Sequence, residues 1–412
     1  MNRCRWAAAL LTALIPVGVA CSPASAAVPG QDCAKPGRAE IGGSWPRAAL
    51  QADAVGPVAD GSGVVVAVLS TGVDAGQPQL DGRVLAGVDV VDRAGAANQD
   101  CTGTGTQVAG VIAGRRDGGD PDVAGLAPGS RILPIRVLLD DPAGSESDPA
   151  TLARGIDTAV QNGAGVIVVA APVYQDQRQL ETAVAGAVGQ GVIVVAAAGD
   201  LGGPDDGNPT PYPAAYPGVI GVGAIDQTGR VSPASQRGEY VDLVAPGVAV
   251  PTLQTGRGLV EVDGTAVAAG FVGAAAALVR GRRGDLNPQQ LTRLLTATAS
   301  PAPIGDAFGA GVVDPLAAVT GRLVAADQRP LPGVDPPAPP DTAADSLRRA
   351  IALTGAVVAA VIVVAVLLAA AAIRRSRRQH WRPGLAPAVP AQVEPLEPGP
   401  PVMLLDTAPW SR

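Results

Sequence analysis

The chain has 412 residues, of which 47% are hydrophobic and 2% aromatic, and its formal net charge is −7. This length suffices for one large α/β core, and the hydrophobic content excludes an intrinsically disordered chain. The 30 basic residues form no patch or stripe in the central part of the sequence, so the charge pattern does not indicate nucleic-acid binding.

The N-terminus has the three-part organisation of a secretory signal peptide. Arg3 and Arg5 precede an apolar run from Trp6 to Ala20, and Ala24-Ser25-Ala26 forms a cleavage site of the small-x-small type. We therefore predict a signal peptide over residues 1–26. An N-terminal extension over residues 27–59 follows it.

The cysteines indicate one disulfide in the exported protein. Cleavage of the signal peptide removes Cys4 and Cys21 and leaves Cys33 and Cys101. In an oxidising compartment an even pair favours a disulfide, and two unpaired buried thiols are the alternative. Cys21 is also a candidate lipoprotein cleavage site, although Gly18 stands where such a site has leucine.

The central region over residues 60–322 alternates between two kinds of pattern. Short Val/Ile-rich runs predict buried strands at residues 64–69, 132–137, 166–169, 192–197 and 219–222. Helical patterns predict helices at residues 106–113, 149–161, 179–189 and 266–281. Such alternation predicts an α/β domain with a mostly parallel sheet and helices on both faces.

The C-terminal region contains a predicted transmembrane helix over residues 350–373. The run from Ile351 to Ile373 carries no charge and is long enough to cross the hydrocarbon core of a bilayer. A proline-rich linker over residues 323–347 precedes it, and a proline-rich tail over residues 374–412 follows. Five arginines follow the run closely and two precede it, which predicts a cytoplasmic tail and an extracytoplasmic domain in a single-pass cell-membrane protein.

Three segments, in chain order, resemble the catalytic blocks of one enzyme superfamily. Residues 66–73 resemble a strand end with Asp-Thr-Gly, residues 100–110 a His-Gly-Thr block that opens a helix, and residues 263–270 a Gly-Thr-Ser-x-Ala-x-Pro block. Further matching blocks lie at residues 123–129, 212–217, 241–247 and 309–314. The chain thus resembles the subtilisin-like serine proteases (peptidase S8) over about residues 45–320, which implies a three-layer fold.

The resemblance also implies that the catalytic residues are replaced. Ser70 stands at the aspartate position, Thr104 at the histidine, Ala266 at the serine and Asp200 at the oxyanion-hole asparagine. The mechanism needs a nucleophile, a general base, an orienting carboxylate and oxyanion donors, and none of these residues supplies the required group. The sequence therefore predicts an inactive pseudoenzyme.

Other residues offer no substitute chemistry. The single histidine, His380, lies beyond the predicted membrane helix, and the single lysine, Lys35, lies in the N-terminal extension. Asp74 and Asp100 lie near the first two blocks, and we expect them to be solvated turn residues. The acidic pairs Asp140-Asp141 and Asp205-Asp206 are candidate calcium ligands, but they lack dense ligand spacing, so we expect them to be solvated surface charges. We therefore expect no metal, and we also expect no cofactor.

Within the superfamily the chain resembles the mycosins of actinobacterial type VII secretion. The shared features are the signal peptide, the cysteine before the second block, the proline-rich linker and the C-terminal anchor. The resemblance implies that type VII secretion membrane components are partners, and that the extension wraps the domain, pinned beside Thr104 by the Cys33–Cys101 disulfide.

The sequence thus predicts a structural or stabilising subunit of a type VII secretion membrane complex. A peptide-binding decoy that uses the substrate groove is an alternative. Residues 166–172 resemble the substrate-pairing strand of the family, but Pro172 removes a backbone donor there. Serine endopeptidase activity by family analogy is the third alternative.

Overall fold

The computed structural model describes residues 33–91, 95–116, 123–138, 147–284, 286–303, 305–321 and 342–378. The predicted signal peptide, Asp140-Asp141, most of the predicted linker and nearly all of the predicted tail lie outside these residues. The chain divides into two units, Met1–Ala326 and Asp327–Arg412.

The first unit is built on a seven-stranded sheet in the order β2-β3-β1-β4-β5-β6-β7, and every strand pair in it is parallel. The strands are β1 (Val65–Ser70), β2 (Val88–Asp89), β3 (Arg131–Arg136), β4 (Val166–Val169), β5 (Ile193–Ala197), β6 (Val219–Ile225) and β7 (Leu243–Pro246). All residues of β1, β4, β5, β6 and β7 are buried. Burial on both faces explains why these strands are continuous apolar runs.

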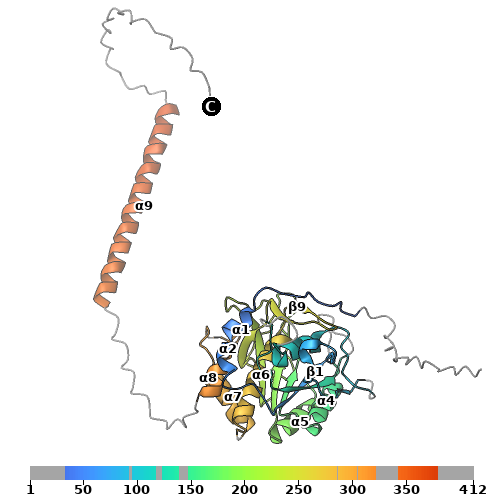
Figure 1. The fold of residues 1–412 in the computed structure, drawn as a ribbon. Helices are drawn as coiled ribbons and strands as arrows, with labels where there is room; N and C mark the ends of the chain where they lie inside the picture. The colour runs from blue at the N-terminus through green and yellow to red at the C-terminus, as the bar shows by residue number, and fades with distance from the viewer. Residues whose placement is uncertain are drawn as a thin grey trace, which may run out of the picture. The chain divides into compact units, whose positions relative to one another are not determined.

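Helices cover both faces of the sheet, as the sequence predicts (Figure 1). Val66 and Val68 of β1 belong to the core cluster that contains α3 (Thr104–Ala113) and α6 (Thr265–Arg282). Ala67 and Leu69 belong to the opposite cluster, with α4 (Pro149–Gln161) and α5 (Arg178–Gly189). Alternating strand residues therefore divide the core into two layers.

Helix α6 packs closely on the sheet because its side chains are small. A Cβ atom added at Gly273 would lie 2.3 Å from Cγ2 of Val168 in β4. The helix is buried from Val267 to Val279, and its first turn begins at the carboxyl end of the sheet.

The remaining elements of this unit are short. They are α1 (Trp45–Ala49), α2 (Ala52–Val55), the 3₁₀ helix η1 (Pro78–Leu80), α7 (Pro288–Ala297), α8 (Pro315–Thr320) and the antiparallel hairpin β8 (Val250–Leu253) with β9 (Leu259–Val262). The sequence analysis did not predict these elements or β2 and β7. The start of α7 could have been predicted from the sequence, because Asn287 as N-cap and Gln290 in the first turn form a capping box.

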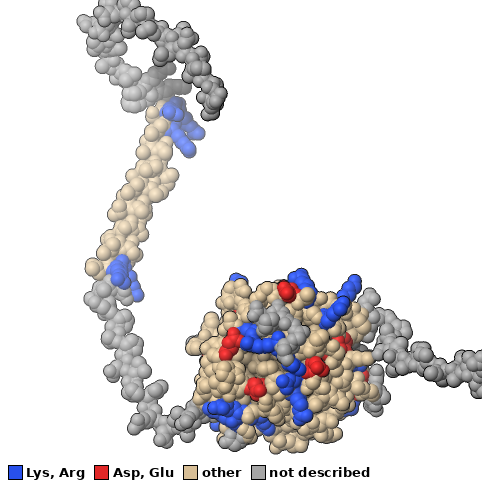
Figure 2. Space-filling model, viewed as in Figure 1, with Lys and Arg blue, Asp and Glu red and all other residues tan. Residues whose placement is uncertain are grey.

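The second unit contains helix α9 (Thr342–Arg378). Its residues Ser346–Arg378 form a candidate membrane span by length and composition, with a mean hydropathy of 3.1 and no buried residue in the most apolar window. The helix is longer at both ends than the predicted span, because the flanking Ser, Leu and Arg residues continue it. Figure 2 shows basic side chains at both ends of the uncharged stretch.

Candidate functional site

A pocket of about 470 Å³ lies at the carboxyl ends of β4 and β5, where α3 and α6 begin. Thr104, Asp200 and Ala266 all line it. The structure therefore brings together three of the four residues that the sequence assigns to catalytic positions. In parallel α/β sheets this edge is the usual place for a ligand.

Ser70, the fourth assigned residue, lies outside the lining of this pocket. It is the last residue of β1 and is fully buried. Its carbonyl accepts hydrogen bonds from Val137 N (2.9 Å) and Leu138 N (3.3 Å), whereas its Oγ has no partner among the described residues. A Cβ atom added at Gly105 would lie 3.3 Å from Ser70 Cβ, so Ser70 is packed beneath the first turn of α3.

The N-terminus of α3 is held by the carboxylate of Asp100. Its Oδ1 accepts hydrogen bonds from Thr71 Oγ1 (2.9 Å) and Gly103 N (2.8 Å). Its Oδ2 accepts from Thr106 N (2.8 Å) and Thr106 Oγ1 (2.7 Å). The side chain satisfies helix N–H groups that would otherwise lack acceptors, and so it fixes the backbone that carries Thr104.

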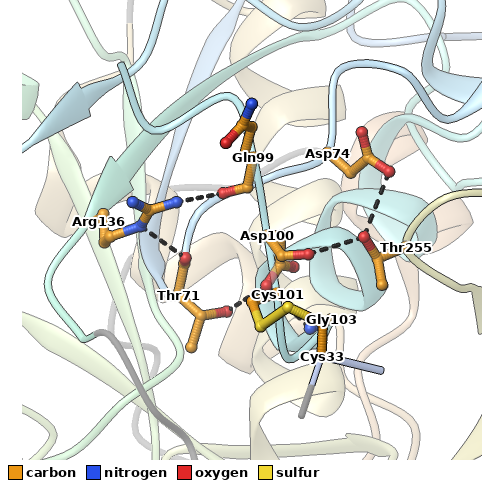
Figure 3. The surroundings of a disulfide bond; sticks show 9 residues. All are labelled: Cys33, Thr71, Asp74, Gln99, Asp100, Cys101, Gly103, Arg136 and Thr255. Carbon is orange, nitrogen blue, oxygen red and sulfur yellow. Dashed lines mark hydrogen bonds between the residues drawn. A yellow bond between two sulfur atoms is a disulfide. The ribbon is translucent and has the colours of Figure 1, made fainter. Parts of the chain in front are cut away.

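The predicted disulfide joins the N-terminal extension to this helix start. Cys33 and Cys101 are bonded, and Ala34 N donates to the Cys101 carbonyl (2.7 Å). Figure 3 shows the disulfide beside Asp100 and Thr255. Arg38 and Leu259 in β9 then exchange two backbone hydrogen bonds, both 2.8 Å, so the extension also adds to the β8–β9 hairpin.

The prediction that Asp74 and Asp100 are solvated turn residues is wrong for Asp100, which is only 5% exposed and accepts the four hydrogen bonds above. Asp74 also has structural contacts. It accepts hydrogen bonds from Gly76 N (2.9 Å) and Gly256 N (2.5 Å) and lies 3.2 Å from Thr255 Oγ1. Both carboxylates, the buried one of Asp100 and the half-buried one of Asp74, thus accept hydrogen bonds from the loops that surround the α3 start.

Asp200 holds the N-terminus of α6 in the same way as Asp100 holds that of α3. Thr265 N, the first amide of the helix, donates to Asp200 Oδ1 (2.9 Å), and Thr265 Oγ1 donates to Oδ2 (3.2 Å). Gly199 N donates to Thr265 Oγ1 (3.0 Å). A carboxylate only accepts hydrogen bonds. Asp200 therefore provides no N–H to a ligand oxygen, as the amide of an asparagine would.

Two buried side chains shape the loops that follow β4 and β5. Gln236 is fully buried, and its Oε1 accepts hydrogen bonds from Tyr174 Oη (2.9 Å) and Leu201 N (3.4 Å). Tyr216 Oη donates to Asp176 Oδ1 (2.8 Å) and accepts from Gln177 N (3.1 Å). Burial raises the pKa of Tyr216 to about 12, so the phenol keeps the proton that it donates to Asp176 even in mildly alkaline solution.

Ala266 and Thr104, at the two helix starts, carry no side chain that ionises near neutral pH. Ala266 ends in a methyl group at the pocket, and Thr104 has a hydroxyl that does not accept a proton near pH 7. Within the described residues no group of three or more His, Cys, Asp or Glu could hold a metal ion.

Comparison with known proteins agrees with this fold. A model of the Subtilase family, Peptidase_S8, matches residues 61–315. The chain belongs to the subtilase family. Its predicted likeness to subtilisin-like proteins and to mycosins is confirmed by the relatives described next.

Three relatives illustrate the range of this likeness. Mycosin-1 of Mycobacterium tuberculosis (strain ATCC 25618 / H37Rv) is 36% identical over 314 residues, which cover 64% of this chain and 70% of the relative. Subtilisin BL of Lederbergia lenta is 35% identical over 258 residues, 63% of this chain and 91% of the relative. A solved structure, described as the serine protease MycP1, an essential component of the type VII (ESX-1) secretion system, has a TM-score of 0.62 and 32% identity over 71% of this chain and 93% of that one.

Sequence reasoning missed part of the pocket of this subtilase. Asp206 and Asp263 also line it, together with Tyr174. Asp263 stands at the start of the third matching block, so its place beside Ala266 could have been inferred. Asp206 was predicted to be a surface charge, and only the folding of the loop after β5 places it at the pocket.

Proposed function

We propose that this subtilase is a non-catalytic, mycosin-like pseudoprotease that acts as a structural or stabilising subunit of a type VII secretion membrane complex. The observation that carries the proposal is Ala266 in the pocket at the first turn of α6. By the family resemblance this is the nucleophile position, and alanine has no atom that can attack a carbonyl carbon.

The neighbouring residues support the same proposal. Thr104 cannot act as a general base, and Ser70 is a neutral side chain that cannot stabilise an imidazolium. Asp200 would place negative charge where a serine protease stabilises a developing oxyanion. His380 lies outside the described residues, beyond the candidate membrane span, so it is no replacement for the missing base.

The relatives support the proposed setting. The similar MycP1 structure is described as an essential component of a type VII secretion system. Helix α9 offers a candidate anchor, and its four C-terminal arginines against Arg348 and Arg349 favour a cytoplasmic tail by the positive-inside rule. We propose a single-pass protein of the cell membrane whose domain is extracytoplasmic.

A peptide-binding decoy is the second candidate, and the open pocket favours it. Two features oppose binding of an extended peptide by strand addition. Pro172 lacks an N–H, and the N–H and carbonyl of Val173 already pair with Tyr212 at 2.8 and 2.7 Å. The structural role therefore remains the first proposal, and serine endopeptidase activity by family analogy is the least supported one.

The test combines partner recovery with an activity probe. The tagged full chain is purified from its own membranes in mild detergent, its partners are identified by mass spectrometry, and the eluate is treated with a fluorophosphonate probe. We expect secretion-core membrane proteins and no label on this chain. Labelled protein would overturn the loss of catalysis, and an absence of secretion-core proteins would overturn the assembly role.

The variant Ala266→Ser is a matched control for the probe. It restores a hydroxyl at the nucleophile position, but no histidine stands at residue 104 to take its proton. We expect it to stay unlabelled as well. Labelling of this variant alone would mean that another residue serves as base, whereas labelling of the unaltered chain would mean that another nucleophile is present.

A further inference from the structure

Arginines gather where the strands of the sheet begin, at the edge opposite to the pocket. Arg131 is the first residue of β3, and its N–H donates to the Val64 carbonyl just before β1 (3.0 Å). Arg83 lies beside it, because Ile132 N donates to the Arg83 carbonyl (2.9 Å). The pocket lies at the carboxyl ends of the parallel strands, so these arginines lie at the amino edge of the sheet.

The C-terminal end of α6 adds three arginines to this edge. Gly165 N donates to the carbonyl of the first residue of β1 (2.9 Å), and a Cβ atom added at Gly165 would lie 3.8 Å from Arg280 Nε. Arg131 and Gly165 stand on the two strands that flank β1, so their backbones are about 10 Å apart. We call the arginines at this edge the amino-edge face: Arg83, Arg131, Arg280, Arg282 and Arg283.

The domain itself leaves much of this positive charge uncompensated. Arg131 and Arg282 are exposed, and neither forms a salt bridge within the described part of the chain. Arg83 Nε and Arg280 Nη1 are buried and have no hydrogen-bond partner among the described residues. Burial also lowers the pKa of Arg280, because it disfavours the charged form. A nearby anion would therefore stabilise these groups.

Two carboxylates lie near Arg83. Asp60 accepts hydrogen bonds from Ser62 N (2.9 Å) and Ser62 Oγ (2.8 Å), and these bonds, with a smaller contribution from the charge of Arg83, lower its pKa. Asp81 is exposed and precedes Arg83 by two residues. The five arginines of the amino-edge face outnumber these two aspartates, so the face attracts anions.

The chain that leads to the candidate membrane span leaves the domain at this face. Arg283 Nη2 donates to the carbonyl of Gly321, which follows α8 and is the last described residue of the domain. Figure 2 shows basic side chains at the lower left of the domain, in the region of α7 and α8 in Figure 1. Residues 322–341 connect Gly321 to α9, and a chain of this length spans at most about 70 Å when fully extended. A bilayer that holds α9 is therefore always near this face.

We propose that the amino-edge face docks on the anionic phospholipid headgroups of the bilayer that holds α9, with Arg131 and Arg282 hydrogen-bonded to phosphate oxygens. The planar guanidinium group matches a phosphate through two parallel hydrogen bonds, and each basic side chain near an anionic membrane adds to the attraction. Docking through this edge turns the pocket away from the membrane. The proposal goes beyond the proposed function: it needs α9 as an anchor, but neither the loss of catalysis nor a secretion partner.

Arginine footprinting of the full chain in nanodiscs tests the docking. The discs contain phosphatidylcholine alone, or phosphatidylcholine and phosphatidylglycerol at about 2:1, and modification by phenylglyoxal is followed by mass spectrometry. We expect Arg131 and Arg282 to react about threefold more slowly in the anionic discs, and about 0.5 M salt to abolish this protection. Arg237 and Arg257, which are exposed in other loops, should react equally in both lipids. Equal rates for Arg131 and Arg282 in the two lipids would overturn the proposal.

A charge-removing variant shows whether the arginines act through one contact surface. Arg282→Gln should about halve the protection of Arg131 in anionic discs, because each arginine contributes to the same attraction. Arg257→Gln removes the same charge from the β8–β9 turn and should leave the protection of Arg131 unchanged. Equal losses in the two variants would mean that only the total charge of the domain matters, which would overturn docking through this face.

An acidic protein is the competing occupant, and the same footprint separates the two. Protection of Arg131 by added polyglutamate in phosphatidylcholine discs, without protection by phosphatidylglycerol, would overturn the lipid assignment. These outcomes are distinguishable from those of the proposed function. Labelling by a fluorophosphonate probe would refute the pseudoprotease and leave the footprint unchanged, whereas missing protection would leave the loss of catalysis and the assembly role untouched.

Discussion

Two helix starts in this protein are held in the same way but differ in their surroundings. Asp100 accepts hydrogen bonds at the start of α3, and Asp200 accepts them at the start of α6. In each case a threonine accepts a backbone N–H and donates to the aspartate: Thr71 for Asp100 and Thr265 for Asp200. By the family resemblance these are the helices that carry the base and the nucleophile of a subtilase.

The difference between them is burial. Asp100 is 5% exposed and lies under the disulfide and the N-terminal extension, whereas Asp200 is exposed at the pocket. Breaking the hydrogen bonds of a buried carboxylate is costly, because neither the carboxylate nor its donors can bond to water instead. The same loss costs far less free energy at an exposed site. The α3 start is therefore a structural junction, and the α6 start remains available to a ligand.

The largest expected effect is loss of the disulfide at the α3 junction. Cys33 and Cys101 are 68 residues apart, and the chain-entropy model assigns such a bridge about 4 kcal/mol. The double variant Cys33→Ser/Cys101→Ser should lose about that much free energy of unfolding, measured by urea unfolding of the full chain in micelles. Reduction of the unaltered protein should give the same loss, and a change below about 1 kcal/mol would contradict the model.

Removal of the Asp100 carboxylate comes next. Asp100→Ala leaves four donors, Thr71 Oγ1, Gly103 N, Thr106 N and Thr106 Oγ1, without their acceptor in a buried site, and we expect a loss of about 3 kcal/mol in the free energy of unfolding. The same urea titration measures it. Asp205→Ala, an exposed aspartate, is the control and should change stability by less than about 0.5 kcal/mol.

The corresponding change at the α6 start should be smaller. Asp200→Ala removes a helix cap that faces solvent, which costs about 1 kcal/mol. Asp200→Asn keeps an oxygen for Thr265 N and should recover most of the loss. A cost for Asp200→Ala as large as that for Asp100→Ala would contradict the contrast between a closed and an open helix start.

The smallest expected effect compares the two threonine–aspartate pairs directly. Double-mutant cycles with Thr71→Val and Asp100→Asn, and with Thr265→Val and Asp200→Asn, give the coupling energy of each pair. We expect about 1.5 kcal/mol for the buried pair and about 0.5 kcal/mol for the pair at the pocket. Equal couplings would mean that the exposure of Asp200 does not weaken its hydrogen bonds.

Much of the sheet was predictable because its strands are buried on both faces. The predicted strand over residues 64–69 is shifted by one residue from β1, and the predicted helix over residues 149–161 coincides with α4. The Asp148 side chain accepts a hydrogen bond from Thr151 N and marks the start of α4. The hairpin β8–β9 and the two-residue strand β2 escaped prediction because short segments of mixed polarity carry little periodic signal.

The sequence by itself determined the family resemblance, the apolar segment of α9 and an even pair of cysteines, and the resemblance is what assigns residues to the catalytic positions of the family. These depend on the identity of side chains and on local patterns. The burial of Asp100, the position of Ser70 outside the pocket lining and the presence of Asp206 and Asp263 in that lining were decided only by the tertiary structure. They depend on which distant loops pack together, and that packing fixes both the exposure of each charge and its hydrogen-bond partners.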